Sequence, residues 1–319
     1  MFKISFHVSK TIVIKKTVDE VYQSLTDFNQ WKHWSPWLYQ EPNCPVTIKI
    51  APHTVGHTQE WNGEMIGSGR MIIETILLNK NIHFQLQFLK PWKSQSTATM
   101  ELHETEEGTH LFWSMNGELP FFLFFLKRMM IAYIGHDMHR GLMMFKEYIE
   151  SGIVSTKTRM IGTVKKNKGY YFGIRTQCPI SELSTHMSKD FGSLMQLMNE
   201  QKVPKADQIM SLTHDFNLIK GVCDYSAILF YNKEIAFPIP SGMIQGEIPS
   251  HQALQADHFG PYHYLGNGWA TLMNMLRFKK IKQNKTIPFY EVYRTFPTMV
   301  KDMDVHTELL VPINTNSNK

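Results

Sequence analysis

The residues with the clearest chemical meaning form one short run, Phe289-Tyr290-Glu291-Val292-Tyr293. The run is typical of a β-strand, in which alternate side chains share a face, so Glu291 should lie on the same face as Phe289 and Tyr293. A carboxylate among aromatic rings is costly to desolvate, and it is tolerated when it is hydrated, protonated or paired with a cationic ligand. Aromatic faces attract the same cation. The run therefore predicts a cation-binding pocket, with a solvent-exposed strand glutamate as the alternative.

Two further aromatic residues are candidates for the wall of that pocket. Tyr262 ends the run Phe259-Gly260-Pro261-Tyr262, and Trp269 stands near the start of the next predicted helix. Tyr262, Trp269 and Tyr293 each combine an apolar body with one polar group, which suits the orientation of a ligand. Together with Glu291 they are predicted to bind a ligand, and ordinary core packing is the alternative for the three aromatic residues.

The first half of the chain carries five tryptophans that are candidates for lining a second cavity, Trp34, Trp37, Trp61, Trp92 and Trp113. Each offers a large apolar surface and one N–H donor. Aromatic residues also dominate ordinary cores, and we expect Trp34 and Trp37 to be core residues. Trp61 and Trp113 are the predicted ligand-binding residues of this half.

Motifs that would fix a reaction are absent from the sequence. It contains no GxSxG, phosphate-binding loop, HExxH, or GxGxxG followed by an acidic residue. Its three cysteines form no CxxC, and His136 and His139 share a helix face without a third ligand. We therefore expect no metal and no cofactor. Acid–base catalysis needs no short motif, so Glu291 is the catalytic candidate if the protein is an enzyme.

The elements of the first half indicate a sheet that ends in a long helix. Thr17 and Glu20 form a capping box before a short helix that should end near Asn29. Residues 83–89 alternate as a strand, and Glu106-Glu107-Gly108 marks a hairpin turn. The closing helix carries one apolar stripe of Ile134, Met138, Leu142, Phe145 and Ile149.

The second half follows a polar, basic segment, residues 151–168, which is predicted to be the inter-domain boundary passing into a first strand. It then repeats one order of elements, strand, helix, strand and strand, twice. The predicted ranges are 169–176, 180–200, 208–214 and 222–231, and then 251–259, 264–280, 289–294 and 307–311. The two helices share the phrases Ser193-Leu-Met-Gln-Leu-Met198 and Thr271-Leu-Met-Asn-Met-Leu276. The fold class is therefore α+β, with a duplicated second domain.

The first half resembles the START-like, SRPBCC or polyketide-cyclase-type helix-grip family over about residues 8–150. The matching residues are Trp31-Lys-His-Trp34-Ser-Pro-Trp37, Gly56 and the segment from Trp61 to Gly69. The resemblance implies a helix-grip domain, a curved antiparallel sheet around a long C-terminal helix, with a cavity for lipids, polyketides or hormones. Only some members of that family are enzymes.

The second half resembles the GyrI-like family, the effector-binding domain of AraC-type regulators, over about residues 158–313. The matching residues are Phe259-Gly260-Pro261-Tyr262, Trp269, Tyr290-Glu291-Val292-Tyr293 with Pro297, and the ending Thr307 to Ile313. The resemblance implies a glutamate that faces lipophilic cations, here Glu291. Some members are hydrolases, which implies Tyr262 or Tyr293 as a proton donor. Glu308 also matches and is expected to be structural.

We expect two domains, residues 1–152 and 158–319, and no residues remain for a helix-turn-helix module, so nucleic acid is not an expected partner. The chain has 319 residues, a net charge of +5 and 43% hydrophobic residues, which excludes wholesale disorder. Lys127 and Arg128 interrupt the apolar run 120–126 before it reaches the roughly 20 residues of a membrane span. The Phe-rich segment 121–125 is interpreted as a pocket lid or a dimer contact. The N-terminus lacks an export signal, so a cytoplasmic location is expected.

The sequence thus favours a two-domain protein that senses or sequesters hydrophobic small molecules, cationic ones included, through pockets in both domains. The alternative is a metal-independent hydrolase or cyclase centred on Glu291. A protein partner or a homodimer remains a third hypothesis.

Overall fold

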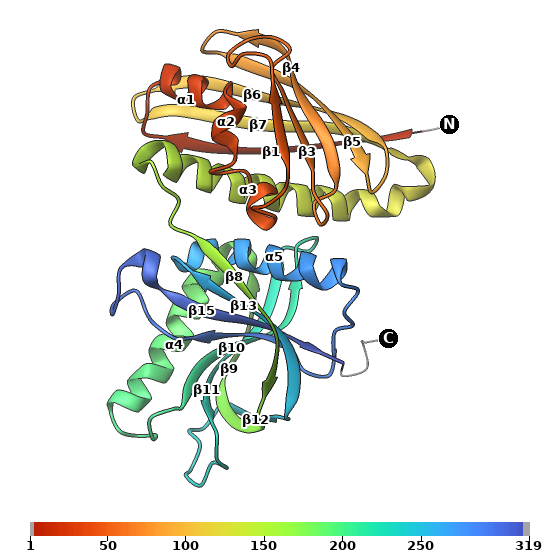
Figure 1. The fold of residues 1–319 in the computed structure, drawn as a ribbon. Helices are drawn as coiled ribbons and strands as arrows, with labels where there is room; N and C mark the ends of the chain where they lie inside the picture. The colour runs from red at the N-terminus through yellow and green to blue at the C-terminus, as the bar shows by residue number, and fades with distance from the viewer. Residues whose placement is uncertain (1–2, 315–319) are drawn as a thin grey trace. The chain divides into compact units, whose positions relative to one another are not determined.

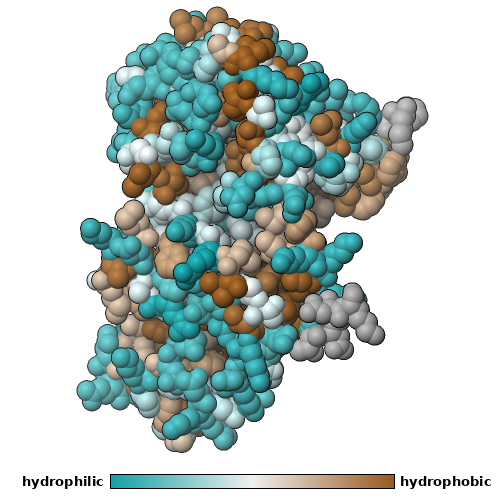
Figure 2. All heavy atoms as spheres, viewed as in Figure 1, coloured by the Kyte–Doolittle hydropathy of each residue, from teal (hydrophilic) through white to brown (hydrophobic). Residues whose placement is uncertain are grey.

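The structure, a computed structural model, describes residues 3–314 (Figure 1). It divides into two compact units, the first ending at Val154 and the second beginning at Ser155. On the face drawn in Figure 2, hydrophilic residues cover most of each unit and apolar residues gather in scattered patches.

The first unit is an antiparallel sheet of seven strands with helices packed against it. Its strands are β1 (Lys3–Ile14), β2 (Val46–Lys49), β3 (Thr58–Asn62), β4 (Ser68–Leu77), β5 (Asn81–Lys90), β6 (Ser94–Thr105) and β7 (Gly108–Pro120), in the sheet order β1-β7-β6-β5-β4-β3-β2. Its helices are α1 (Val18–Leu25), α2 (Phe28–Trp31), the short 3-10 turns η1 (Leu38–Gln40) and η2 (Phe121–Leu126), and the long α3 (Lys127–Ser151). Figure 1 shows α3 running along the sheet, which confirms the helix-grip expectation.

Local sequence signals account for these elements. The Thr17 hydroxyl accepts from the Glu20 backbone N–H, and the Glu20 carboxylate accepts from the Thr17 backbone, so the capping box is present at the start of α1. The predicted single helix is instead two, because Asp27 caps a new helix after α1 ends at Leu25. In β5, Ile82, Phe84 and Leu86 are buried, as their alternation predicts.

The apolar stripe of α3 is fully buried only in the middle of the helix. Met138, Leu142 and Phe145 are buried, whereas Ile134 and Ile149 are half-buried. Gly152, with φ of 83°, ends the helix in the left-handed region that glycine adopts without strain.

The second unit is a sheet of eight strands with two helices. Its strands are β8 (Lys157–Lys166), β9 (Gly169–Pro179), β10 (Gln208–Asn217), β11 (Val222–Tyr231), β12 (Ile244–Ile248), β13 (His251–Phe259), β14 (Phe289–Tyr293) and β15 (His306–Ile313), in the order β12-β9-β11-β10-β14-β15-β13-β8. Its helices are η3 (Ile180–Glu182), α4 (Leu183–Asn199), η4 (Tyr262–Tyr264), α5 (Leu265–Phe278) and η5 (Asp302–Asp304). The duplication is confirmed, with β10 and β14 adjacent at the centre.

The first strand of this half begins earlier than predicted. Residues 151–168 were expected to be a boundary that passes into a strand at residue 169, yet residues 157–166 already form β8, which pairs with β13 of the second repeat. In the same way β12, which precedes the second repeat, pairs with β9 of the first. Each repeat thus has an additional edge strand that pairs with the other repeat, and the two repeats join into one sheet through the central pair β10 and β14.

Both helices of this unit cover the same face of its sheet. One apolar cluster packs beneath α4 and includes Phe172, Leu194 and Tyr225, and a second packs beneath α5 and includes Leu272 and Leu309. The opposite face carries a third cluster, in which Tyr290 and Val292 of β14 take part. Glu291, between them in sequence, therefore faces the helices.

Candidate ligand-binding site

Glu291 lies at the centre of the helix-covered face. It stands opposite Ser211 of β10 on one side and Leu309 of β15 on the other. The residue is only 8% exposed, and Trp269 of α5 contacts its side chain. The alternative of a solvent-exposed strand glutamate is therefore wrong for this structure.

Two neutral donors hold the Glu291 carboxylate. The Trp269 indole N–H donates to Oε1 at 2.7 Å, and the Tyr293 hydroxyl donates to Oε2 at 2.5 Å. Within residues 3–314, Glu291 makes no ion pair with a lysine, arginine or histidine. The carboxylate is thus oriented by hydrogen bonds, while its charge is left without a partner of opposite sign.

This environment raises the pKa values of Glu291, Tyr262 and Tyr293. Burial raises the pKa of Glu291, and the hydrogen bonds from Tyr293 and Trp269 offset that shift only in part. Burial, followed by the nearby Glu291 carboxylate, raises the pKa of Tyr262 to about 12 and that of Tyr293 well above its ordinary value. Both hydroxyls therefore stay protonated at neutral pH and remain available as donors.

Further aromatic rings pack against the two residues that donate to the carboxylate. The rings of Tyr262 and Tyr293 lie 5.5 Å apart, and those of Trp269 and Phe289 lie 5.3 Å apart. Phe191 of α4 adds a fifth ring, 5.2 Å from Tyr293. The structure thus brings together all four sequence-predicted residues of this half, Glu291, Tyr293, Tyr262 and Trp269.

Phe191 was missed by the sequence analysis, although the repeat carries a signal for it. Phe191 stands two residues before Ser193 in the first repeat phrase, and Trp269 stands two residues before Thr271 in the second. The two rings are therefore equivalent positions of the duplicated helices, and each approaches the central strands from its own helix.

Two buried polar side chains lie on the same face. His258 of β13 pairs in register with Thr307 of β15, which in turn stands opposite Tyr293. The Thr307 hydroxyl has no hydrogen-bond partner among the described residues, and the His258 ring has only a weak contact with the backbone of Pro261. Burial lowers the pKa of His258 to about 4, so its ring is neutral at pH 7.

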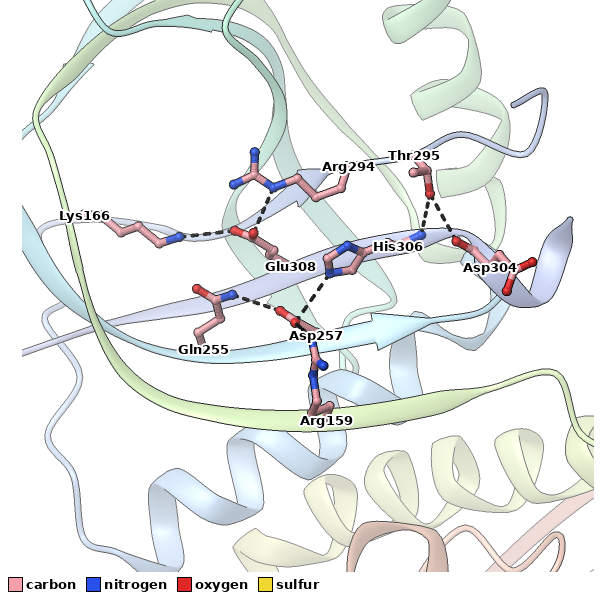
Figure 3. A network of polar contacts seen from close by, with 9 residues as sticks. All are labelled: Arg159, Lys166, Gln255, Asp257, Arg294, Thr295, Asp304, His306 and Glu308. Atoms are coloured by element: carbon pink, nitrogen blue, oxygen red, sulfur yellow. Dashed lines mark hydrogen bonds and ion pairs between the residues drawn. The ribbon is translucent and has the colours of Figure 1, made fainter. Parts of the chain in front are cut away.

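A polar network on the opposite face of the sheet provides a contrast (Figure 3). Glu308 accepts from Arg294 at 2.8 Å and from Lys166 at 3.2 Å. Burial acts to raise the pKa of Glu308, but these two cations outweigh it and the net shift is downward. Asp257 is paired with Arg159 at 2.7 Å. Glu308 and Asp257 are thus matched to cations, whereas Glu291 is held by uncharged donors, as is Asp190 of α4, which accepts from the hydroxyls of Thr176 and Tyr225.

A cavity of about 190 Å³ lies on this opposite face. Lys166, His251 and Tyr290 are among its lining residues, and the His251 ring lies 2.9 Å from the Tyr290 hydroxyl. Glu291 and its aromatic neighbours are not among those lining residues, so this cavity is separate from the Glu291 cluster. Because Glu291 is only 8% exposed, a ligand that contacts its carboxylate must displace side chains that cover it.

The tryptophans of the first unit pack mainly on one another. Trp113 is 4% exposed, and its ring contacts those of Trp31, Trp34 and Trp37. Trp61 is half-buried against Phe88, at 6.0 Å between ring centroids. Trp92 is 64% exposed, so the expectation that it lines a cavity was wrong.

Trp34 is a core residue, as expected, but its N–H has a feature that the sequence did not reveal. The residue is 1% exposed, and within residues 3–314 its indole nitrogen has no hydrogen-bond partner. A buried N–H without an acceptor costs about 1–3 kcal/mol, so this donor is available to a ligand or a water molecule.

No group of three or more histidine, cysteine or acidic side chains between residues 3 and 314 is placed to hold a metal ion. Over the same residues, no helix is both long and apolar enough to cross a membrane.

The fold and site together define a protein of two α+β domains, the second with a buried carboxylate in an aromatic cluster. Each of the two domains matches a family model. Residues 5–150 match the family described as polyketide cyclase / dehydrase and lipid transport, and residues 163–314 match the GyrI-like small molecule binding domain. Both resemblances expected from the sequence are confirmed, and a small molecule is a supported partner.

No curated protein matches the chain. Solved structures that resemble it include the Aha1 dimer from Colwellia psychrerythraea, at 21% identity over 46% of this chain and 98% of that one, with a TM-score of 0.34. A Staphylococcus aureus protein of unknown function matches at 13% identity over 47% and 96%, with a TM-score of 0.39. A complex of EcmrR with DNA matches at 16% over 59% and 65%, with a TM-score of 0.40. These comparisons give no support to the expected absence of a nucleic-acid partner.

Proposed function

We propose that the C-terminal half binds lipophilic organic cations, with Glu291 as the counter-charge and Trp269, Tyr293 and Tyr262 as part of the aromatic wall. The observation that carries this proposal is a carboxylate that is 8% exposed, held by two neutral donors and paired with no cation among residues 3–314. A cationic ligand supplies the missing charge.

The balance of energies favours a delocalised cation over a small hydrated one. A buried charge is stabilised only if its attraction to a partner offsets the free energy lost when the charge is desolvated. A compact ion such as an ammonium must also lose its own strong hydration on entry. A cation with aryl groups has little hydration to lose and gains apolar contact with the rings. Each aromatic face adds roughly 0.5–2 kcal/mol of cation–π attraction.

For the N-terminal half we propose an apolar ligand with one hydrogen-bond acceptor. The buried indole N–H of Trp34 without a partner supports this, because an acceptor on the ligand would satisfy it. Trp61 and Trp113 are the proposed lining residues. The matched family description, which includes lipid transport, agrees with an apolar ligand.

Three probes of similar shape and different charge test the C-terminal proposal. Tetraphenylphosphonium is a cation, tetraphenylborate is an anion of nearly the same shape, and triphenylphosphine oxide is neutral. The midpoint temperature of thermal unfolding of the full chain should rise with the cation and change much less with the other two probes. A ligand at a hundredfold its Kd adds about 2.7 kcal/mol to the free energy of unfolding. Equal stabilisation by the cation and the anion would refute a role for the Glu291 charge.

A hydrolase or cyclase reaction at Glu291 is the second candidate. It is favoured by the raised pKa of a carboxyl group that contacts a protonated tyrosine hydroxyl, an arrangement suited to acid–base chemistry. Turnover of a hydrophobic ester or lactone that is abolished by Glu291→Gln would support it. Turnover that survives the substitution would exclude Glu291 as the acid or base.

A further inference from the structure

The turn η2 exposes four phenylalanines in a stretch of five residues. The exposed fractions are 58% for Phe121, 58% for Phe122, 59% for Phe124 and 63% for Phe125. Single exposed apolar residues are common on protein surfaces, but a contiguous group of large ones marks an interaction site. In Figure 2, apolar atoms gather at the end of the first unit where α3 begins.

The exposed surface continues onto the first turns of α3. Met129 is 38% exposed and Tyr133 is 46% exposed. Met129 and Tyr133 are four residues apart in α3, which places them on one side of the helix that follows η2. We call these six residues, Phe121, Phe122, Phe124, Phe125, Met129 and Tyr133, the phenylalanine patch.

The two charged side chains inside the segment of the patch are both basic, and Glu118, three residues before Phe121, is paired with Lys3 at 2.6 Å. Between Glu118 and Asp137 the only lysine or arginine residues are Lys127 and Arg128, and no acidic residue occurs. Arg128 is exposed and Lys127 is half-buried, next to the phenylalanines in sequence. Aromatic rings bordered by basic side chains are the composition that inserts into the interface of an anionic membrane.

We propose that the phenylalanine patch docks the protein on the surface of an anionic lipid membrane. The rings enter the interface between headgroups and acyl chains, while Lys127 and Arg128 meet the lipid phosphates. A second copy of the chain is a poorer occupant, because a twofold contact through this patch would bring both basic pairs together. The proposal does not rest on ligand binding in either half.

Sedimentation with lipid vesicles tests the proposal on the full chain. Vesicles of phosphatidylcholine alone are compared with vesicles that also contain phosphatidylglycerol. The wild-type protein should sediment with the anionic vesicles and much less with the neutral ones. The double substitution Phe122→Ser/Phe125→Ser should lower the partition coefficient at least tenfold. The control Trp92→Ser removes a large side chain that is equally exposed, at 64%, and should leave partition unchanged.

A second variant allows the proposal to be tested even if the serine variant does not fold. Lys127→Glu/Arg128→Glu retains every ring, and it should weaken binding to the anionic vesicles while binding to neutral ones stays the same. Vesicle binding that neither double variant reduces would overturn the proposal. So would a concentration-dependent dimer, seen by analytical ultracentrifugation, that the serine variant abolishes, because the patch would then be a contact between copies.

Discussion

Trp269 and Glu291 come from different elements and meet through one hydrogen bond, the indole N–H of α5 donating to the carboxylate Oε1 of β14 at 2.7 Å. Tyr293 donates to the other oxygen from two residues along the same strand. The carboxylate is thus fixed in orientation by uncharged groups alone, and its charge stays available to a ligand.

Removal of either donor should make the Glu291 carboxylate harder to ionise. Trp269→Phe and Tyr293→Phe each keep an aromatic ring and remove one hydrogen bond, so the pKa of Glu291 should rise further in both. Affinity for tetraphenylphosphonium at pH 7 should fall, and it should recover at higher pH. Titration by intrinsic fluorescence at several pH values checks this. A loss that is the same at every pH would show that the donors act through shape alone.

Cation affinity should depend on pH because Glu291 must be ionised in the complex. Burial raises the pKa of Glu291 in the free protein, so binding must expel a proton when the pH lies below that value. Affinity should therefore fall as the pH drops through the raised pKa, by up to about tenfold per pH unit. Isothermal titration calorimetry with the cation measures this slope, and triphenylphosphine oxide is the control that should show none.

His258 should make folding stability depend on pH in the opposite sense to a salt-bridged histidine. Its folded pKa is about 4, below the ordinary value of 6.5, so the unfolded chain binds the proton more readily. Stability is complete above pH 6.5 and is lost as the pH falls toward 4, by on the order of 3 kcal/mol.

The substitution His258→Leu should flatten this dependence. Urea unfolding of the full chain at pH 7 and pH 5 gives the two free energies of unfolding. His136 of the first unit also has a pKa of about 4 and remains in the variant, so the difference between the proteins is the quantity to compare. Equal slopes in both proteins would mean that the His258 ring has an unrecognised partner.

Gly69 should be required for the packing of Trp61. A Cβ at this position would lie 2.5 Å from the Gln87 carbonyl oxygen and 2.6 Å from the Trp61 ring. Gly69→Ala should therefore destabilise the first unit by about 1–3 kcal/mol in chemical denaturation. Gly192→Ala is the matched control, because a Cβ there meets nothing within 4 Å and alanine favours the helix. A stable Gly69→Ala protein would mean that β4 and β5 shift easily.

The sequence predicted the elements with strong local signals and missed those without them. The hairpin at Glu106-Glu107-Gly108 was predicted, and β6 and β7 pair there with Thr105 opposite Gly108. The strand β8 was missed because its lysines indicate a solvated segment, and lysines are also what edge strands carry. The exchange of β8 and β12 between the repeats depends on long-range pairing, which has no local signal.

Local sequence likewise predicted some features of the candidate site and missed others. Alternation along β14 predicted that Glu291 and Tyr293 share a face, and both lie on the helix-covered face. The hydrogen bond from Trp269 depends on how α5 docks, and the position of Phe191 depends on α4. Spacing along the chain could not show either of these two contacts.

Outside the site, Cys178 and Cys223 are distant in sequence and stand directly opposite each other on β9 and β11. Spacing along the chain could not show this pairing either.

The central claim is that Glu291 supplies the counter-charge for a lipophilic cation, and one comparison of affinities tests it most directly. Isothermal titration calorimetry should measure the Kd of tetraphenylphosphonium for the wild-type chain and for Glu291→Gln, which keeps the shape and removes the charge. We predict a loss of at least tenfold, or about 1.4 kcal/mol, in the variant, with the affinity for triphenylphosphine oxide unchanged. Equal affinity of both proteins for the cation would contradict the account and leave Glu291 a structural residue.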